Sequence, residues 1–265
     1  DRLSAFLEKK RLAAELAKSD SSKKKFSDEA KKYVAQIALV DQSMSMLEDE
    51  KVSGRDNVRC FESSYEVSLS AAQNDAYSAV KSAFQEHLPV LLNGITGSGK
   101  TEIYVKLALE TMRQGKNVLY MIPEIAVSRQ LEERLRCIFG AYLFTFHSKV
   151  TAAKREDVAS EIRSGNYIVL GTRSSIFLPH HDLGLIIVDE EHDTSYKQDA
   201  PAPRYNGRDT ALMLARIYGA EIILGTATPS LESLYNCRIG RMKKVDLPER
   251  YYGASDSDVE IIDTS

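Results

Sequence analysis

A glycine-rich turn at residues 94–101 carries the residue types best suited to bind phosphate. The pattern G-x-x-x-x-G-K-[ST] is met by Gly94, Gly99, Lys100 and Thr101. Glycines let the backbone curl so that successive N–H groups point at one anion, and the helix that follows adds the positive end of its dipole. We predict that Lys100 reaches the β- and γ-phosphates of a nucleotide and that the Thr101 hydroxyl is a ligand of Mg²⁺. The predicted nucleotide-binding residues of this turn are Gly94, Thr96, Gly97, Ser98, Gly99, Lys100 and Thr101.

A second cluster of reactive side chains follows the apolar run 185–188. Asp189, Glu190, Glu191 and His192 come at the end of this predicted strand, where α/β sheets bind ligands. In phosphate-loop enzymes an acid here holds Mg²⁺, and a neighbouring glutamate is free to orient the attacking water. We therefore assign Asp189 to the metal and Glu190 to the water. The alternative, a solvated strand end, is weakened by the phosphate-binding turn upstream.

A third signal, G-T-A-T-P at 225–229, follows the predicted strand 221–224. The hydroxyls of Thr226 and Thr228 could hydrogen-bond the acid cluster, sense the terminal phosphate and relay its loss. Taken alone, the same residues could equally form an ordinary turn and the N-cap of the next helix.

The elements that must position these residues alternate regularly from residue 69 onward. The predicted strands are short, continuous apolar runs, which indicates strands buried on both faces and hence a mostly parallel sheet with helices on both faces, an α/β fold. Helices are predicted over 70–87, 100–114, 126–139, 152–164, 207–218 and 230–237. Strands are predicted over 90–92, 117–122, 142–146, 167–170, 185–188 and 221–224.

The first 68 residues do not show this regular alternation of apolar strands and helices. Residues 1–50 read as two helices, the second with an apolar stripe at spacings of three and four, and 51–68 are polar and rich in turn residues. We predict a small helical or winged-helix-like module with its linker over 1–68, a nucleotide-binding domain over 69–250, and a linker over 251–265. The lysines near the start of the second helix either form a solvated loop, the simpler reading, or touch nucleic acid.

Composition narrows the class of protein. The 265 residues carry a net charge of −3, so any contact with nucleic acid must come from a local patch. The three cysteines are far apart and include no C-x-x-C pair, which argues against a disulfide framework and a self-contained zinc site and fits a reducing, cytosolic setting. No apolar run approaches 18 residues, and the N-terminus is not a signal peptide.

Taken together, the three signals resemble motifs I, II and III of superfamily 2 helicases, and D-E-E-H resembles the DExH branch. Their flanks resemble the PriA family of primosomal helicases more narrowly, over roughly 69–265. The matching segments are N-G-I-T-G-S-G-K-T-E-I-Y at 93–104, I-P-E-I at 122–125, F-H-S at 146–148, G-T-R-S-S-I-F at 171–177, D-E-E-H-D-T-S-Y-K-Q at 189–198 and P-R-Y-N-G-R-D at 203–209.

The resemblance implies a RecA-like lobe of an ATP-dependent 3′→5′ DNA helicase of replication restart. It implies that Gln73 reads adenine, that His192 links the acids to Thr226 and Thr228, and that 192–209 is an aromatic-rich loop that senses DNA. Its implied partners are forked or single-stranded DNA, other primosome proteins and single-strand-binding protein, in the bacterial cytoplasm, with no membrane. The implied DNA-binding residues are Pro123, Glu124, Thr172, Arg173, Tyr196, Lys197, Arg204, Tyr205 and Arg208.

This sequence departs from the family pattern at some positions, and other parts of the family's proteins are expected outside it. Val158 stands where family members often have tryptophan, and Thr226 stands where they often have serine. We expect the second lobe, its arginine finger and its zinc-binding cysteines outside these residues, so the isolated chain should be weakly active or inactive. Two other readings stay open: another DExH translocase, such as a remodelling or RNA motor, and a nucleotide-gated binding module without turnover.

Overall fold

The computed structural model describes residues 61–124, 129–147, 151–200 and 204–249. The chain divides into two compact units, 1–57 and 58–265, and every described residue belongs to the second. The helices predicted over 1–50 and the linker predicted over 251–265 therefore lie outside the described residues.

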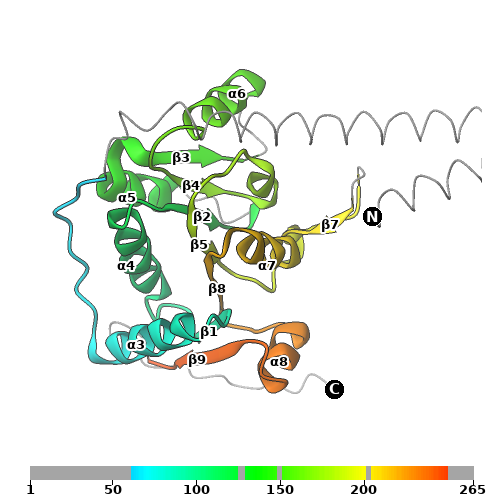
Figure 1. Cartoon of the computed structure of the whole chain (residues 1–265). Coiled ribbons are helices and arrows are strands. Elements are labelled where there is room, and N and C mark those ends of the chain that lie inside the picture. The colour runs from blue at the N-terminus through cyan, green and yellow to red at the C-terminus, as the bar shows by residue number, and fades with distance from the viewer. Residues whose placement is uncertain (1–60, 125–128, 148–150, 201–203, 250–265) are drawn as a thin grey trace, which may run out of the picture. The chain divides into compact units, whose positions relative to one another are not determined.

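The described unit is built on a seven-stranded sheet in which every neighbouring pair of strands is parallel (Figure 1). The strand order is β3-β4-β2-β5-β8-β1-β9. The strands are β1 (Val90–Gly94), β2 (Asn117–Met121), β3 (Leu143–Phe146), β4 (Ile168–Gly171), β5 (Leu183–Val188), β8 (Glu221–Thr226) and β9 (Lys243–Leu247).

Helices cover both faces of this sheet, as Figure 1 shows for α4 on one side and α7 on the other. The α-helices are α3 (Ala71–Gln85), α4 (Lys100–Arg113), α5 (Arg129–Phe139), α6 (Ala152–Glu161), α7 (Gly207–Tyr218) and α8 (Leu231–Arg238). Short 3-10 helices are η2 (Gly140–Tyr142), η3 (Arg173–Phe177) and η4 (Thr194–Tyr196).

The pleat of β5 shows why its sequence is apolar throughout. Leu185 and Ile187 join the core under α3, α4 and α5, whereas Ile186 and Val188 join the core under α7. Because successive side chains of a strand point to opposite faces, a strand covered on both sides has no polar alternation. The predicted parallel α/β sheet with helices on both faces is confirmed.

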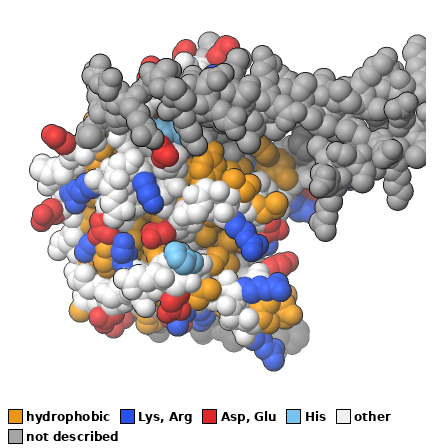
Figure 2. Space-filling model, viewed as in Figure 1, with side chains coloured by type: hydrophobic (Ala, Val, Ile, Leu, Met, Phe, Trp, Pro, Cys, Tyr) orange, Lys and Arg blue, Asp and Glu red, His pale blue; other side chains and the backbone are white. Residues whose placement is uncertain are grey.

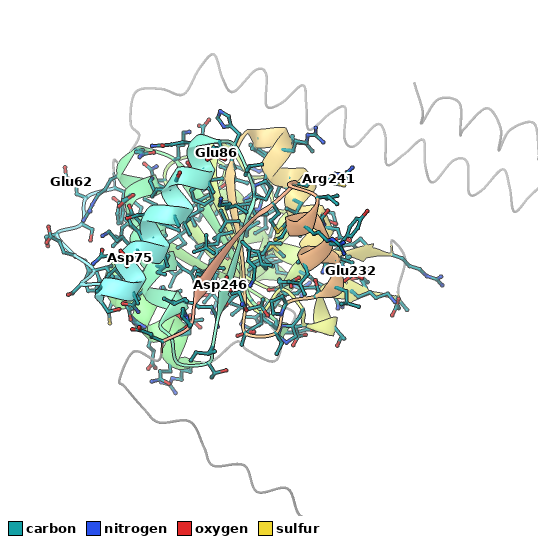
Figure 3. The ribbon with its side chains drawn as sticks, turned by 90° about the horizontal axis from the view of Figure 1, so that it is seen from below. Glu62, Asp75, Glu86, Glu232, Arg241 and Asp246 are labelled. Atoms are coloured by element: carbon teal, nitrogen blue, oxygen red, sulfur yellow. The ribbon has the colours of Figure 1, made fainter. Side chains whose placement is uncertain are left out.

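Two features were absent from the sequence prediction. β9 is an additional edge strand that pairs in parallel with β1, and the side chain of Asn93 donates a hydrogen bond to Asp246 over 2.7 Å. Figure 3 looks at this edge, with Asp246 on β9. The second feature is a small antiparallel hairpin of β6 (Lys197–Gln198) and β7 (Tyr205–Asn206).

The strand order determines what meets at the carboxyl edge of the sheet. β8 lies between β1, which leads into the glycine-rich turn, and β5, which leads into the acids. Asn93 is paired with Thr226, and Val188 with Leu224. The three motifs therefore emerge from three adjacent strands at one edge, although 89 residues separate Lys100 from Asp189.

Candidate nucleotide-binding site

The turn after β1 has backbone geometry that requires glycine. Gly97 and Gly99 both have φ of +80°, a conformation that side chains with a Cβ disfavour. A Cβ on Gly94 would lie 2.7 Å from Oγ of Ser98 and 3.1 Å from Cγ of Lys100. The glycines thus allow the turn to close tightly around the start of α4.

Two polar groups inside this turn are suited to an anionic ligand. The Ser98 hydroxyl is buried and, within the described part of the chain, has no hydrogen-bond partner. The Lys100 ammonium is nearly buried, with 8% of the residue exposed, and donates to the carbonyl of Gly94 over 2.8 Å. A buried hydroxyl and cation are costly without acceptors, and phosphate oxygens supply them, so these residues fit a nucleotide phosphate.

Gln73 lies behind the turn with its amide fully engaged. Its amide nitrogen donates to the carbonyls of Ser98 (3.1 Å) and Gly99 (3.3 Å), and its amide oxygen accepts the N–H of Ser70 (2.9 Å). The residue is 1% exposed and also completes the capping box that starts α3. In this arrangement Gln73 holds the phosphate-binding turn, and pairing with adenine would require these bonds to open.

Asp189 follows β5 directly and is held by two donors. Its Oδ1 accepts the Tyr104 hydroxyl over 3.1 Å and the backbone N–H of Glu190 over 3.1 Å. Burial, together with the neighbouring charge of Glu190, raises the pKa of Asp189 to about 6, while Lys100 and these hydrogen bonds act in the opposite direction. A cation beside Asp189 would favour its charged form.

The glycine-rich turn and the acid cluster face each other. Nζ of Lys100 lies 3.9 Å from Oε1 of Glu190. Glu190 has φ of +47°, an uncommon conformation for a residue other than glycine. Lys100 and Glu190 therefore border the same space, although they come from α4 and the end of β5.

The end of β8 lies in contact with the last member of the acid cluster. Nδ1 of His192 is 2.8 Å from the hydroxyl oxygen of Thr226, and the same oxygen accepts the backbone N–H of Thr228 over 3.0 Å. His192 Nδ1 also lies 3.6 Å from Oε2 of Glu190. Thr226 is fully buried, whereas Thr228 is exposed and takes part through its backbone.

Tyr104 is a site residue that sequence reasoning did not single out. It lies one helical turn after Lys100, is fully buried, and donates to Asp189. A Cβ on Gly225 would lie 1.5 Å from its hydroxyl oxygen, so the glycine that begins G-T-A-T-P makes room for this tyrosine. The sequence indicated this residue only through the apolar periodicity of α4, which places Tyr104 and its hydroxyl on the buried face of the helix.

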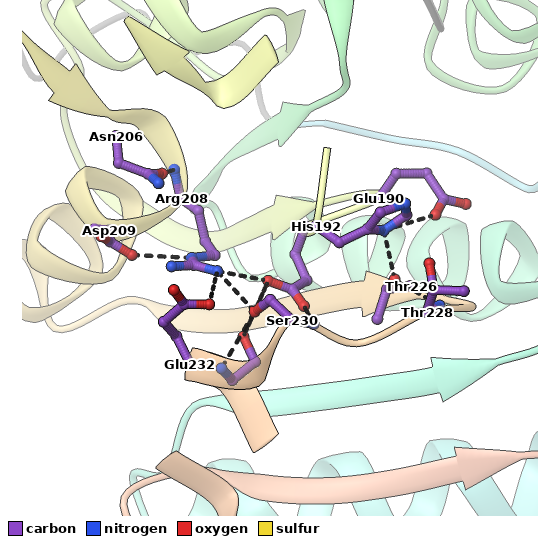
Figure 4. A network of polar contacts seen from close by, with 11 residues as sticks. Glu190, His192, Asn206, Arg208, Asp209, Thr226, Thr228, Ser230 and Glu232 are labelled. Carbon is purple, nitrogen blue, oxygen red and sulfur yellow. Dashed lines mark hydrogen bonds and ion pairs between the residues drawn. The ribbon is translucent and has the colours of Figure 1, made fainter. Parts of the chain in front are cut away.

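The structure places Tyr196 and Arg208 in the interior, away from the DNA-facing role implied for them. Tyr196 is 1% exposed and donates its hydroxyl to the carbonyl of Asp189 over 2.7 Å, so it offers no free ring face. Arg208 is 8% exposed and pairs over 3.1 Å with Glu191, which is 2% exposed. Both residues support the acid cluster from behind, as Figure 4 shows for Arg208.

The other residues expected to contact DNA gather around the β6–β7 hairpin. Arg173 donates to the carbonyls of Ser195 (2.7 Å) and Lys197 (3.3 Å), and Lys197 is itself exposed. The backbone N–H of Glu124 donates to the hydroxyl of Ser195 over 3.3 Å. Pro123 and Thr172 are buried, and Arg204, directly before β7, is exposed.

An aromatic pair, one ring exposed and the other half-buried, includes Tyr205 of this hairpin. The rings of Phe177 and Tyr205 meet edge to face, with centroids 5.0 Å apart and planes at 80°. Phe177 is 61% exposed, which is unusual for so large an apolar side chain. Sequence reasoning selected Tyr205 but not Phe177, although both lie in the segments quoted for the family resemblance.

The two residues expected to bind a metal ion, Thr101 and Asp189, are both oxygen donors. Within the residues described, no group of three His, Cys, Asp or Glu side chains could enclose a metal ion. Mg²⁺ is commonly bound by one or two protein oxygens together with phosphate oxygens and water. A site of this kind needs only a few protein oxygens, such as the two expected from Thr101 and Asp189.

Comparisons with known proteins show what this chain is similar to. The family described as DEAD/DEAH box helicase matches residues 70–237. Replication restart protein PriA of Rickettsia prowazekii is 42% identical over 196 residues, which cover 74% of this chain and 30% of the relative. The protein of the same name from Synechocystis is 38% identical over 224 residues, covering 80% of this chain and 27% of the relative.

Among solved structures, the DUF1998 helicase MrfA bound to DNA matches with a TM-score of 0.49 and 21% identity, over 69% of this chain and 27% of that one. The chain thus spans about 30% of the length of the curated relatives it matches. Because the family match extends over well more than half of the sequence, the chain belongs to the DEAD/DEAH box helicase family.

Proposed function

We propose that this chain is the first motor lobe of an ATP-dependent DNA helicase of replication restart. The observation that supports this most directly is the approach of Lys100 to Glu190, 3.9 Å apart across the end of β8. It joins a phosphate-binding turn to an acid cluster, the two halves that phosphoryl transfer requires. The curated relatives described as replication restart protein PriA supply the cellular role.

The residues of the site divide the chemistry between them. The backbone N–H groups of the turn, the Ser98 hydroxyl and Lys100 hold the phosphates, while Thr101 and Asp189 hold Mg²⁺. When bound, Mg²⁺ neutralises charge on the phosphate oxygens. Glu190 orients the attacking water, and its position is most of its contribution because phosphoryl transfer needs little covalent help from the protein.

Coupling to motion starts at Thr226. The His192–Thr226 hydrogen bond connects the acid cluster to the end of β8, so loss of the terminal phosphate can alter the segment that continues into α8. The motor then converts this change into 3′→5′ movement along one DNA strand, together with a second lobe that supplies an arginine.

The hairpin surface is the proposed single-strand path. Lys197 and Arg204 offer charge, and Phe177, packed against the half-buried Tyr205, offers exposed ring surface for stacking of bases without sequence preference. Positive and negative side chains are interspersed over the face seen in Figure 2, and the net charge of the chain is −3. DNA would therefore be attracted by the side chains of the hairpin surface rather than by overall charge. Forked or single-stranded DNA, other primosome proteins and single-strand-binding protein are the proposed partners.

The proposed cellular setting is the bacterial cytoplasm, where replication restart takes place. Across the described ranges, no helix combines the length and the apolar character that membrane crossing demands.

Steady-state ATP hydrolysis by the full-length protein tests the proposal. We expect turnover to rise on addition of forked or single-stranded DNA, and Lys100→Ala and Glu190→Gln to abolish it. Lys154→Ala, a matched change of an exposed lysine on α6, should leave turnover unchanged. Unchanged hydrolysis in both site variants would refute the residue assignment, and stronger stimulation by RNA would favour another type of DExH motor.

A further inference from the structure

We propose that the outer edge of β3 binds an extended, basic segment of a partner protein, which pairs with β3 as an additional strand. β3 is the outermost strand on one side of the seven-stranded sheet, with α5 and α6 beside it (Figure 1). A groove of about 510 Å³ is lined by residues of all three elements. None of its lining residues is among those assigned to nucleotide or magnesium, so this site is independent of the proposed function.

The backbone of β3 directs hydrogen-bonding groups into this groove. On its inner side β3 pairs with β4, and the carbonyl of Phe146 accepts the N–H of Thr172 over 3.0 Å. Because backbone groups of successive strand residues point to alternate sides, those of Leu143 and Thr145 point outward, away from β4. The N–H of Leu143 donates to the carbonyl of Gly140, and no described strand pairs with this side. The carbonyl of Leu143 and both backbone groups of Thr145 can therefore receive another strand.

Helices on opposite faces of the sheet form the walls of the groove. α5 packs on one face through Leu135 and Ile138, and α6 packs on the other through Val158 and Ala159. Phe144 and Val158 are half-buried and give the α6 wall apolar surface. A segment added to β3 would thus extend the sheet between two existing walls, the arrangement in which strand addition binds peptides.

The α6 wall also carries two acids. Asp157 and Glu161 are exposed, lie one helical turn apart, and make no side-chain hydrogen bond or ion pair with the described residues. On the α5 wall, Glu132 is already paired with Arg136 over 3.0 Å. With Lys154 at the start of α6, the lining holds three acids against two Lys or Arg side chains. Like charges at the spacing of Asp157 and Glu161 oppose each other, so cations from a partner would be favourable there.

These features select a segment in which basic and apolar residues alternate. Successive side chains of a strand point to opposite faces, so one set would meet α6 and the other α5. A lysine or arginine on the α6 side can lay its aliphatic stem over Val158 and place its charge near Asp157 or Glu161. Apolar side chains on the other side would pack beside Leu143, which lines the groove.

A second copy of this chain fits the groove less well. Two β3 strands paired about a two-fold axis would bring the same surface of each copy together. The α6 acids of one copy would then face those of the other, and like charges across an interface oppose association. The expected occupant is therefore a basic segment of another protein.

Binding of a labelled octapeptide of alternating valine and lysine to the full-length protein tests the proposal. Fluorescence anisotropy should show saturable binding that weakens as salt is added, because part of the contact is ionic. An octapeptide of alternating valine and glutamate is the control and should not compete. Failure of the valine–lysine peptide to bind at millimolar concentration would overturn the proposal.

Two substitutions of Thr145 separate strand addition from binding by side chains alone. Thr145→Pro removes the outward N–H, which β4 does not use, so the protein should fold and Kd should rise roughly 10-fold or more. Thr145→Val keeps the N–H and loses only the hydroxyl that donates to Glu132, so its Kd should stay close to wild type. Melting temperatures check that both variants are folded. Equal Kd values in the two variants would exclude strand addition.

Substitutions on α6 test the charge preference. Asp157→Asn combined with Glu161→Gln should raise Kd about fivefold, the scale of two exposed ion pairs. Glu156→Gln changes an exposed acid of the same helix outside the groove lining and should bind like wild type. Unchanged affinity in the double variant would remove the acids from the site and with them the basic character of the partner.

Amide hydrogen exchange locates the peptide without any substitution. In the unbound protein the N–H of Thr145 should exchange faster than those of Phe144 and Phe146, which face β4, and saturating peptide should protect it. Protection confined to other segments would overturn the assignment. Dimerisation that excludes the peptide and is lost in Thr145→Pro would give this edge to a second copy and would likewise overturn the proposed occupant.

Discussion

The hydroxyl of Tyr104 donates a hydrogen bond to Oδ1 of Asp189 over 3.1 Å. This contact joins the helix behind the phosphate-binding turn to the proposed magnesium ligand. Because Oδ1 also accepts the N–H of Glu190, the second carboxylate oxygen of Asp189 is the one that would remain for a metal ion. The placement of Asp189 thus depends on a residue from the first motif as well as on its own strand.

Replacing Tyr104 by phenylalanine should weaken magnesium use without unfolding the protein. The hydrogen bond favours the charged carboxylate, and a bond to a charged group contributes on the order of 1.5–3 kcal/mol. We expect the Mg²⁺ concentration for half-maximal ATP hydrolysis to rise by about 10-fold, the lower end of that range. Titrating Mg²⁺ at fixed ATP measures this, and Tyr77→Phe on α3 is the control. Identical titration curves would contradict the assignment.

Gly225→Ala should lower the free energy of unfolding more than the addition of one methyl group would suggest. The new Cβ would lie 1.5 Å from the Tyr104 hydroxyl oxygen and 2.7 Å from Cζ, so the tyrosine must leave its place. Overpacking of this kind costs about 1–3 kcal/mol of stability. Adding Tyr104→Phe removes the closer atom, so the double variant should be more stable than Gly225→Ala alone. Additive losses in urea unfolding would show that the two residues do not compete for this space.

Acid should destabilise the described unit through His180. This residue is 3% exposed, its Nε2 donates to the carbonyl of Ser175 over 2.8 Å, and its Nδ1 lies 3.1 Å from the Tyr167 hydroxyl. Burial lowers the pKa of His180 from 6.5 to about 4. Below pH 6.5 the unfolded chain binds a proton that the folded state rejects, so the free energy of unfolding should fall by roughly 3 kcal/mol between pH 6.5 and 4.

The matched variants separate this effect from general acid unfolding. In His180→Gln the slope of unfolding free energy against pH over this range should become smaller, whereas the exposed His87→Asn should keep the wild-type slope. Urea unfolding at several pH values gives the slopes. Equal slopes for all three proteins would show that His180 is not the residue responsible.

Phe177→Ala should weaken binding of single-stranded DNA by the full-length protein. Stacking of one base on an aromatic side chain contributes about 1–3 kcal/mol, so Kd should rise by roughly 10-fold or more. Anisotropy of a labelled thymidine oligonucleotide at fixed salt measures the change. Met213→Ala is the control, since this apolar side chain on α7 is as exposed as Phe177, at 66%. Equal affinity in both variants would remove Phe177 from the DNA path.

Most of the sheet could be predicted because its strands are buried on both faces. Strands such as β2 and β5 are continuous apolar runs, and the glycine-rich turn and the acids mark which ends carry the site. β9 escaped prediction because K-K-V-D-L is an edge strand with three exposed residues, so it lacks that apolar signature. The hairpin strands have two residues each, too few for any periodicity.

The site was predictable where motif spacing fixes the chemistry, and less so where packing decides which way a side chain points. Tyr196 and Arg208 have the residue types of a DNA-binding loop, yet their neighbours turn them inward, towards Asp189 and Glu191. Only the three-dimensional arrangement distinguishes them from Tyr205, which stays near the surface. Gln73 likewise carries the expected amide but uses it on the phosphate-binding turn.

The most direct test of the nucleotide site is a crystal structure of the full-length protein with a non-hydrolysable ATP analogue and Mn²⁺, which replaces Mg²⁺ and gives anomalous signal. We expect the triphosphate to lie in the turn 94–101, with one anomalous peak between the Thr101 hydroxyl and the Asp189 carboxylate. A nucleotide bound elsewhere, or a metal peak remote from both residues, would contradict the account.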